Sequence, residues 1–306
     1  MSSLIEQATR RLEQLRQAGV ILNTSASEDS KIYISNKSNI DIPSTVLDDR
    51  ISEKNIKLPT FSRKVELDLD ALAVAGIVSP NAPRSQIADQ YRVIKRPLIS
   101  NAMGKGPSPI ENGNLIMVTS ALAGEGKSFS AINLAMSIAT ELDNTVMLVD
   151  ADVARPSVLR MLGLPASPGL LDLLVGDVDD LSSVLLRTNI DKLTLLPSGT
   201  PHLRATELLA SDAMSQLIRN IADRYSDRII IFDSPPLLLT TESRVLATHM
   251  GQIVMVVHAE KTLQIDIQHA LSSIEACPVK LMVLNQAKNG VQGGYGGYGY
   301  GYGYEQ

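Results

Sequence analysis

The chain has 306 residues, of which 44% are apolar and 20% are charged, with 28 lysines and arginines against 33 aspartates and glutamates. This composition is typical of a globular protein and excludes a disordered one, and the net charge of −5 gives no reason to expect nucleic-acid binding. The one cysteine, Cys277, excludes a disulfide framework, and no apolar run approaches the roughly 20 residues that cross a bilayer. We expect a cytoplasmic chain that reaches the inner face of a membrane only through a partner.

The N-terminal part of the chain predicts a helix followed by a linker. Residues 1–22 predict an amphipathic helix with one apolar stripe, formed by Leu4, Ile5, Ala8, Leu12 and Leu15. That stripe suits packing on its own domain or docking onto a partner chain. Residues 23–65 are rich in Ser, Asn, Asp and Lys and predict a flexible linker. Periodicity then returns, with a helix expected from Arg84 to Ile94 that ends before Pro97.

Residues 66–288 predict one domain, in which short apolar strands alternate with longer helical segments. The expected strands are Leu115–Thr119, Thr145–Val149, Leu193–Leu196, Arg228–Phe232, Gln252–His258 and Val279–Leu284. The helical patterns between them include Ser128–Leu142, Thr206–Tyr225 and Leu263–Glu275. Continuous apolar strands are typical of a parallel sheet covered on both faces. The pattern predicts a doubly wound α/β fold with a mostly parallel sheet and helices on both faces.

The last residues, 289–306, read NGVQGGYGGYGYGYGYEQ and contain almost nothing that could build a core. We expect a flexible tail. It concentrates five of the chain's eight tyrosines, which are Tyr295, Tyr298, Tyr300, Tyr302 and Tyr304. Tyrosines on a glycine chain of this length are exposed and have a long reach.

The sharpest motif is the segment Ala121–Ser128, ALAGEGKS, which follows a predicted strand and opens a predicted helix. Gly124 and Gly126 allow backbone N–H groups to turn toward phosphate oxygens, and the helix N-terminus adds a partial positive charge. Lys127 is placed to reach the β- and γ-phosphates of ATP, and the Ser128 hydroxyl to ligate Mg²⁺. The motif therefore predicts a phosphate-binding loop and, with the alternating strands and helices, a fold of the P-loop NTPase type.

Three aspartates follow two of the predicted strands. Asp150 and Asp152 come after one strand, and Asp233 follows a later one. Ligands of doubly wound sheets bind at the carboxyl ends of the strands, so we expect all three carboxylates to face the nucleotide phosphates and Mg²⁺.

In these motifs the sequence resembles the bacterial tyrosine kinases (BY-kinases), which bind ATP through a phosphate loop. The resemblance covers roughly residues 84–306 and is carried by AGEGKS, VDADVARP, PSGTPHLRATELLAS, IIIFDSPP and the tyrosine-rich end. The segment SQIADQYRVIKRPL and the N-terminal helix look most like the soluble tyrosine autokinases of exosortase-linked exopolysaccharide clusters.

The resemblance implies an ATP- and Mg²⁺-dependent protein-tyrosine autokinase that phosphorylates its own C-terminal tyrosines. It implies a catalytic role for Lys127, Asp150 and Asp152, with Asp152 orienting or deprotonating a tyrosine hydroxyl. The implied metal ligands are Ser128, Asp150, Asp152 and Asp233, and the implied nucleotide contacts are Gly124, Glu125, Gly126, Lys127, Ser128, Phe129 and Arg155. Where the family has arginine in its second motif this chain has Ala154, with Arg155 following.

The resemblance also implies partners. The family's assembly motif Glu-x-x-Arg-x-x-Arg appears here as Asp89, Arg92 and Lys95, which predicts a homo-oligomeric ring; lysine lacks the bidentate pairing of arginine. An activator is expected as a separate transmembrane co-polymerase of polysaccharide export, with a role in controlling exopolysaccharide synthesis or export.

Two other functions remain open at this point. A partitioning or cell-division ATPase of the same fold would carry a signature lysine five positions before Lys127, where this chain has Leu122. A scaffold of a polysaccharide export complex that binds ATP without catalysis is the other alternative.

Overall fold

The computed structural model describes residues 62–80, 85–225 and 227–288. The chain divides into two units, Met1–Asn55 and Ile56–Gln306, and all of these described residues belong to the second unit. The predicted N-terminal helix, all but the last residues of the predicted linker, and the tyrosine tail lie outside the described residues and stay predictions.

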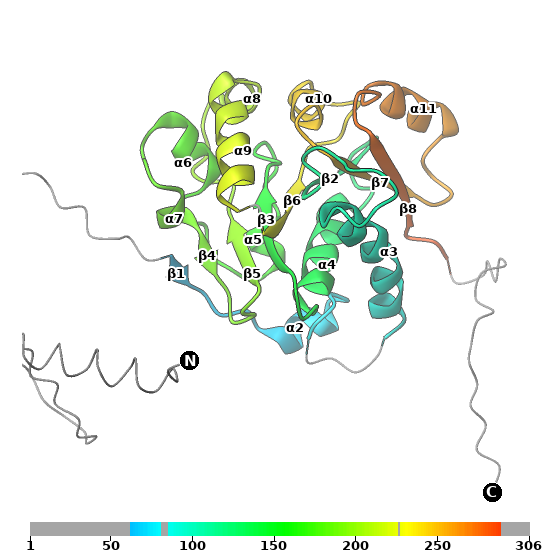
Figure 1. Ribbon diagram of the computed structural model, residues 1–306, viewed down its shortest axis with the longest axis horizontal. Helices are drawn as coiled ribbons and strands as arrows, with labels where there is room; N and C mark the ends of the chain where they lie inside the picture. Colours follow the sequence, from blue (N-terminus) through cyan, green and yellow to red (C-terminus); the bar gives the residue numbers. More distant parts are fainter. Residues whose placement is uncertain (1–61, 81–84, 226, 289–306) are drawn as a thin grey trace, which may run out of the picture. The chain divides into compact units, whose positions relative to one another are not determined.

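The described residues build an eight-stranded sheet in the order β1-β4-β5-β3-β6-β2-β7-β8 (Figure 1). Every neighbouring pair is parallel except β4 with β5, which is antiparallel. The strands are β1 (Arg63–Lys64), β2 (Leu115–Ser120), β3 (Thr145–Asp150), β4 (Leu186–Arg187), β5 (Leu193–Leu196), β6 (Arg228–Asp233), β7 (Gln252–His258) and β8 (Val279–Asn285). All strands expected from the sequence are present, and the mostly parallel α/β class is confirmed.

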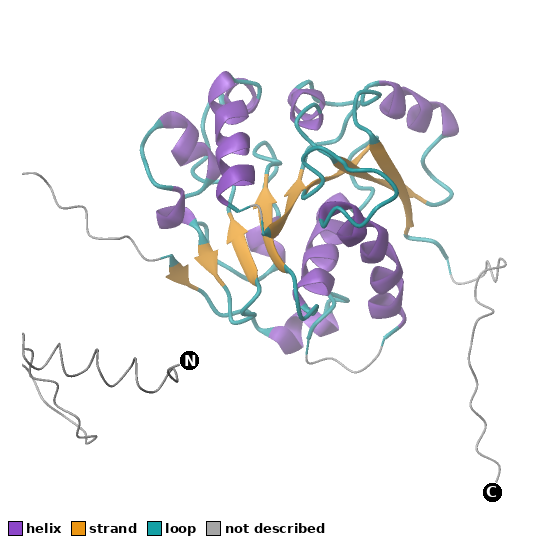
Figure 2. Ribbon diagram, in the orientation of Figure 1, coloured by secondary structure: helices purple, strands orange, loops and turns teal. Residues whose placement is uncertain are grey.

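Helices cover both faces of this sheet, as Figure 2 shows. One layer holds α2 (Leu69–Val74), α3 (Gln86–Ala102), α4 (Lys127–Ala139) and α5 (Val158–Met161). The other holds α6 (Leu170–Val175), α7 (Leu181–Val184), α8 (Ala205–Leu209), α9 (Asp212–Arg224), α10 (Glu242–Ala247) and α11 (Gln264–Ser272). Successive residues of β2 alternate between the two cores, Met117 packing into one and Val118 into the other. Among the described helices, none is long and apolar enough to span a bilayer.

Helix α3 differs from its prediction, because it continues through Pro97 to Ala102. Proline lacks the N–H that would bond to the carbonyl four residues earlier, here that of Val93. Both residues are exposed, with Val93 at 71%, so water can satisfy that carbonyl. Leu98, one residue beyond the proline, is fully buried against the core that α4 also faces. Tertiary packing therefore outweighs the local cost of the proline.

The predicted helix Thr206–Tyr225 is two helices, α8 and α9, with a break at Ser211. The Ser211 hydroxyl donates to the carbonyl of Leu208 at 2.6 Å and accepts from the N–H of Met214 at 3.2 Å. These side-chain bonds replace the backbone ladder at this point, so that one serine ends α8 and caps α9.

The sheet begins at Arg63, within the segment predicted as linker. The N–H of Val65 donates to the carbonyl of Arg187 at 2.8 Å. The side chain of Asn189 bonds to both backbone groups of Leu67, each at 3.0 Å. Strands as short as β1 and β4 have too few residues to show the two-residue alternation of a strand in the sequence. Their presence follows only from these long-range hydrogen bonds.

Replacing Pro97 by alanine should raise the free energy of unfolding by about 1–3 kcal/mol, because alanine restores an N–H donor within an exposed helix turn. Chemical denaturation of the two proteins measures the difference. A less stable Pro97→Ala protein would show that the proline ring packs against the domain more than its exposure indicates.

Candidate nucleotide-binding site

The predicted phosphate loop connects β2 to α4 at the carboxyl edge of the sheet. Gly124 and Gly126 have φ values of 84° and 92°, a region that favours glycine. Gly126 is also the N-cap of α4, so no side chain covers the free N–H groups of that helix's first turn. A loop with this backbone leaves N–H groups for phosphate oxygens, as the sequence motif requires.

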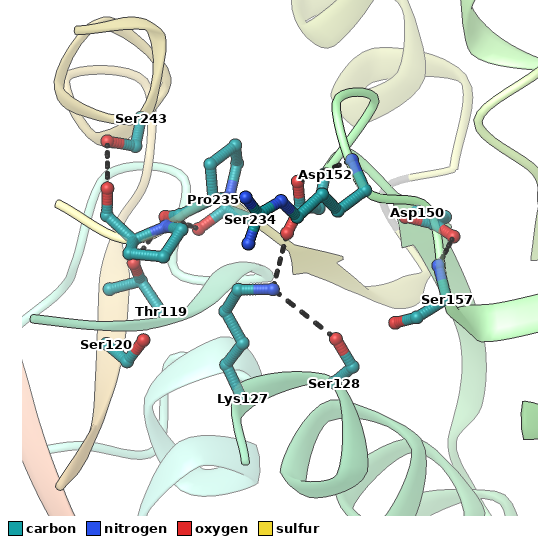
Figure 3. A network of polar contacts seen from close by, with 12 residues as sticks. Thr119, Ser120, Lys127, Ser128, Asp150, Asp152, Ser157, Ser234, Pro235 and Ser243 are labelled. Atoms are coloured by element: carbon teal, nitrogen blue, oxygen red, sulfur yellow. Dashed lines mark hydrogen bonds and ion pairs between the residues drawn. The ribbon is translucent and has the colours of Figure 1, made fainter. Parts of the chain in front are cut away.

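Lys127 and Asp152 point toward one another across the mouth of this loop (Figure 3). The Lys127 Nζ lies 2.5 Å from Asp152 Oδ2, and their side chains are only 13% and 5% exposed. The Ser128 hydroxyl lies 3.5 Å from the same Nζ. The structure therefore brings together a cation and a carboxylate that stand 25 positions apart in the sequence.

Asp150 and Asp233 end the neighbouring strands β3 and β6 and are register partners. Asp150 Oδ2 accepts bonds from the N–H groups of Ser157 and Val158, at 3.1 and 3.0 Å. Its other oxygen and both oxygens of Asp233 are buried and have no hydrogen-bond partner. Burial raises the pKa of Asp150 to about 6 and that of Asp233 to about 7. Carboxylates in this condition are stabilised by a cation.

These oxygens fit a magnesium ion that is shared with phosphates. Among the described residues, no cluster of three or more His, Cys, Asp or Glu could hold a metal unaided. Mg²⁺ binds in many nucleotide sites through one or two carboxylates, waters and the substrate's phosphates. The unpartnered oxygens of Asp150 and Asp233, with the hydroxyl of Ser128 close to Lys127, supply that kind of incomplete ligand set.

Three of the predicted nucleotide contacts have distinct surroundings. Arg155 lines the pocket beside the loop, and its N–H donates to Asp152 Oδ1 at 3.2 Å. The Phe129 side chain packs in the core shared by α2 and α4, beneath Gly76. The carboxylate of Glu125 is only 3% exposed, and it bonds inside the protein rather than at the loop mouth. Sequence spacing alone did not separate these three positions.

A pocket of about 360 Å³ opens onto the Lys127–Asp152 pair. Its walls are mainly small or apolar residues, namely Ala123, Gly124, Ala154, Pro235, Pro236, Leu239 and Thr240, beside Lys127, Asp152 and Arg155. The sequence motifs did not single out Leu239 and Thr240, which lie three and four residues after the motif that carries Asp233. An apolar wall next to a buried charged pair suits an aromatic side chain whose polar end must reach that pair.

The three predicted assembly residues do not share one environment. Asp89 and Arg92 are exposed and pair with each other on the surface of α3. Lys95 is buried; it donates to the carbonyl of Ser137 in α4 and pairs with Glu141 at 2.7 Å. Its charge thus lies at the carbonyl end of α4, where a cation is favoured. An assembly contact through this segment stays a prediction, with Asp89 and Arg92 as its exposed members.

Comparison with known families places this geometry in context. A family model described as "ParA: NUBPL iron-transfer P-loop NTPase" matches residues 111–284, which is more than half of the chain. Tyrosine-protein kinase YwqD of Bacillus subtilis is 28% identical over 75% of this chain and 94% of its own length. Tyrosine-protein kinase ptk of Acinetobacter johnsonii is 31% identical over 59% of this chain. That match takes in 24% of the ptk sequence, so the chain spans about a quarter of this longer relative.

Solved structures agree with the sequence relatives. The crystal structure of the chimerical protein CapA2B2 matches with a TM-score of 0.57 at 26% identity, over 72% of this chain and 93% of its own. Tyrosine-protein kinase CpsD of Streptococcus agalactiae is 30% identical over 61% of this chain and 82% of its own length. We therefore assign the chain to the P-loop NTPases and, among them, to the bacterial tyrosine-protein kinases, as its motifs predicted. The curated relatives that it matches are protein-tyrosine kinases.

The raised pKa values of Asp150 and Asp233 set a pH dependence. Between about pH 4 and pH 7 the folded protein keeps protons that an unfolded chain, with ordinary aspartates, has released. The contribution of Asp233 to the stability of the metal-free protein therefore falls as pH rises through this window. The midpoint of thermal unfolding in EDTA, compared between wild type and Asp233→Asn, should diverge in favour of the variant from pH 5 to pH 8. A constant difference would contradict the assignment.

Lys95→Ala should lower the free energy of unfolding by about 2 kcal/mol, because it leaves Glu141 and the end of α4 without their buried cation. Arg96→Ala, an exposed neighbour on the same helix, is the matched control and should change stability by less than about 0.5 kcal/mol. Urea denaturation measures both. If the two substitutions lowered the free energy of unfolding equally, the structural role assigned to Lys95 would be wrong.

Proposed function

We propose that the chain is an ATP-dependent protein-tyrosine autokinase that phosphorylates the tyrosines of its C-terminal tail in trans. The observation that carries this proposal is the Lys127–Asp152 pair, 2.5 Å apart, at the floor of an apolar-walled pocket beside the phosphate loop. Tyr295, Tyr298, Tyr300, Tyr302 and Tyr304 are the proposed acceptors.

Lys127 and Asp152 would change partners when nucleotide binds. The phosphate loop and Lys127 hold the triphosphate, which leaves the carboxylate of Asp152 free to orient the acceptor hydroxyl and take its proton. The tyrosine oxygen then forms a bond to the γ-phosphorus as the bond to the β,γ-bridging oxygen breaks, and ADP leaves. Arg155 lines the same pocket, and we propose that it contacts the transferred phosphate.

Asp150, Asp233 and Ser128 would hold Mg²⁺. A bound Mg²⁺ supplies charge neutralisation on the phosphates. The protein's contribution is to keep three carboxyl oxygens, one of Asp150 and two of Asp233, buried and without other partners. Because the pKa values of both residues are raised, lowering the pH would protonate them and weaken metal binding.

The alternative of a switch ATPase lacks its signature. At the position of the partner-contacting lysine the chain has Leu122, whose side chain packs against the core and whose N–H is held by Glu125. A non-catalytic scaffold would not explain the cluster of tyrosines in the tail.

On the family resemblance we further propose a cytoplasmic homo-oligomer that regulates exopolysaccharide synthesis or export. A separate transmembrane partner of polysaccharide export would recruit and activate it.

A mixing experiment tests both transfer and its direction. Isotope-labelled wild-type protein and unlabelled Lys127→Met protein are incubated together with ATP and Mg²⁺, and the C-terminal peptides are analysed by mass spectrometry. We expect several added phosphates on the unlabelled peptide, because an active subunit modifies the tail of an inactive one. Lys127→Met alone, and labelled Asp152→Asn in place of wild type, should give none.

Two results would contradict the proposal. Phosphates on the labelled peptide alone would show that no phosphate passes to the inactive chain, and an unmodified tail in every mixture would reject the autokinase activity.

A further inference from the structure

Glu125 is a buried residue of the phosphate loop, only 3% exposed, and both of its carboxylate oxygens accept hydrogen bonds. Oε2 accepts from the N–H of Leu122 at 2.7 Å, and Oε1 accepts from the hydroxyl of Thr262. A buried carboxylate loses its hydration, so the donors that replace water strongly determine where it sits.

Thr262 presents its hydroxyl from a rigid turn. The turn follows β7, and the N–H of Thr262 donates to the carbonyl of His258 at 3.1 Å. The Thr262 oxygen in turn accepts from the N–H of His258, also at 3.1 Å. Because an ionised carboxylate can only accept, the Thr262 hydroxyl donates its hydrogen to Glu125 Oε1. The contact joins residues 137 positions apart, and so reflects tertiary structure alone.

The end of β8 holds the same loop from a second direction. The Asn285 amide donates to the carbonyl of Glu125 at 2.8 Å, and the Gln286 amide donates to the carbonyl of Gly124 at 3.2 Å. In a trans peptide the N–H points away from the C=O of the same unit, so the N–H groups of Glu125 and Gly126 face away from the Asn285 and Gln286 amides. The edge formed by β7 and β8 therefore supports the loop at both backbone and side-chain level.

We propose that Thr262 is a positioning residue for nucleotide binding, which acts through Glu125 to hold the phosphate loop in its phosphate-accepting shape. Glu125 links the first part of the loop, at Leu122, to the N-terminus of α4. Thr262 anchors that link to the sheet. The inference rests on the nucleotide site of the proposed function but not on the transfer of phosphate to tyrosine.

The test measures binding of a fluorescent ADP analogue, with Mg²⁺, to the full chain. Thr262→Val keeps the shape of the side chain but removes the hydroxyl, and should weaken binding about tenfold, the size expected for loss of a bond to a charged group. Thr262→Ser keeps the hydroxyl and should bind within about twofold of wild type. Thr248→Val is the matched control, since the Thr248 hydroxyl bonds only locally to the carbonyl of Val245.

The thermal unfolding of each nucleotide-free variant separates positioning from simple stability. A Thr262→Val protein with a lower melting temperature but unchanged nucleotide affinity would overturn the inference, as would a Thr262→Ser protein that binds as weakly as Thr262→Val. Should Thr262→Val fail to fold, Glu125→Gln probes the same contact from the loop side, and its unchanged affinity would equally reject the proposal. Absence of binding by wild type would instead reject the proposed nucleotide site itself.

Discussion

The site depends on the meeting of strand ends at one edge of a parallel sheet. Strands β2, β6 and β3 are neighbours, so the phosphate loop, Asp233 and Asp150 emerge side by side although they lie far apart in the sequence. Parallel strands achieve this only through crossovers, and the helices of those crossovers bury both faces of the sheet. The same burial removes water from the carboxylates and raises the pKa of Asp150 and Asp233.

The three aspartates at this edge of the sheet differ in their partners. Asp152 has Lys127 as a close partner, whereas oxygens of Asp150 and Asp233 have none. Removing carboxylates from water without compensation is costly, so a fold that keeps them there carries a local strain that a divalent cation relieves. In the proposed mechanism, Lys127 binds the nucleotide phosphates instead of Asp152. The Asp152 carboxylate is then available to the acceptor tyrosine in the pocket. Nucleotide binding would thus also activate the Asp152 carboxylate.

Two contacts extend the site into the rest of the domain. Lys95 ties α3 to the C-terminal end of α4, the helix whose N-terminus carries the phosphate loop. Thr262 and the end of β8 hold the loop from the opposite side. Contacts from the rest of the domain therefore reach α4 at its C-terminal end and the phosphate loop at the carbonyls of Gly124 and Glu125. The tail itself begins four residues after Asn285, at residue 289.

Sequence by itself determined the fold class, the phosphate loop and the three aspartates, because each is a local signal. Apolar runs, glycines before a lysine, and acids at strand ends have the same meaning wherever the chain goes. Tertiary structure alone decided the course of α3 through Pro97, the burial of Lys95 and the link from Thr262 to Glu125. A charge motif on a helix does not say whether its lysine faces solvent or the end of another helix. Likewise, a threonine hydroxyl has no sequence signal for a partner 137 positions away, since only the packing of β7 beside β2 brings the two together.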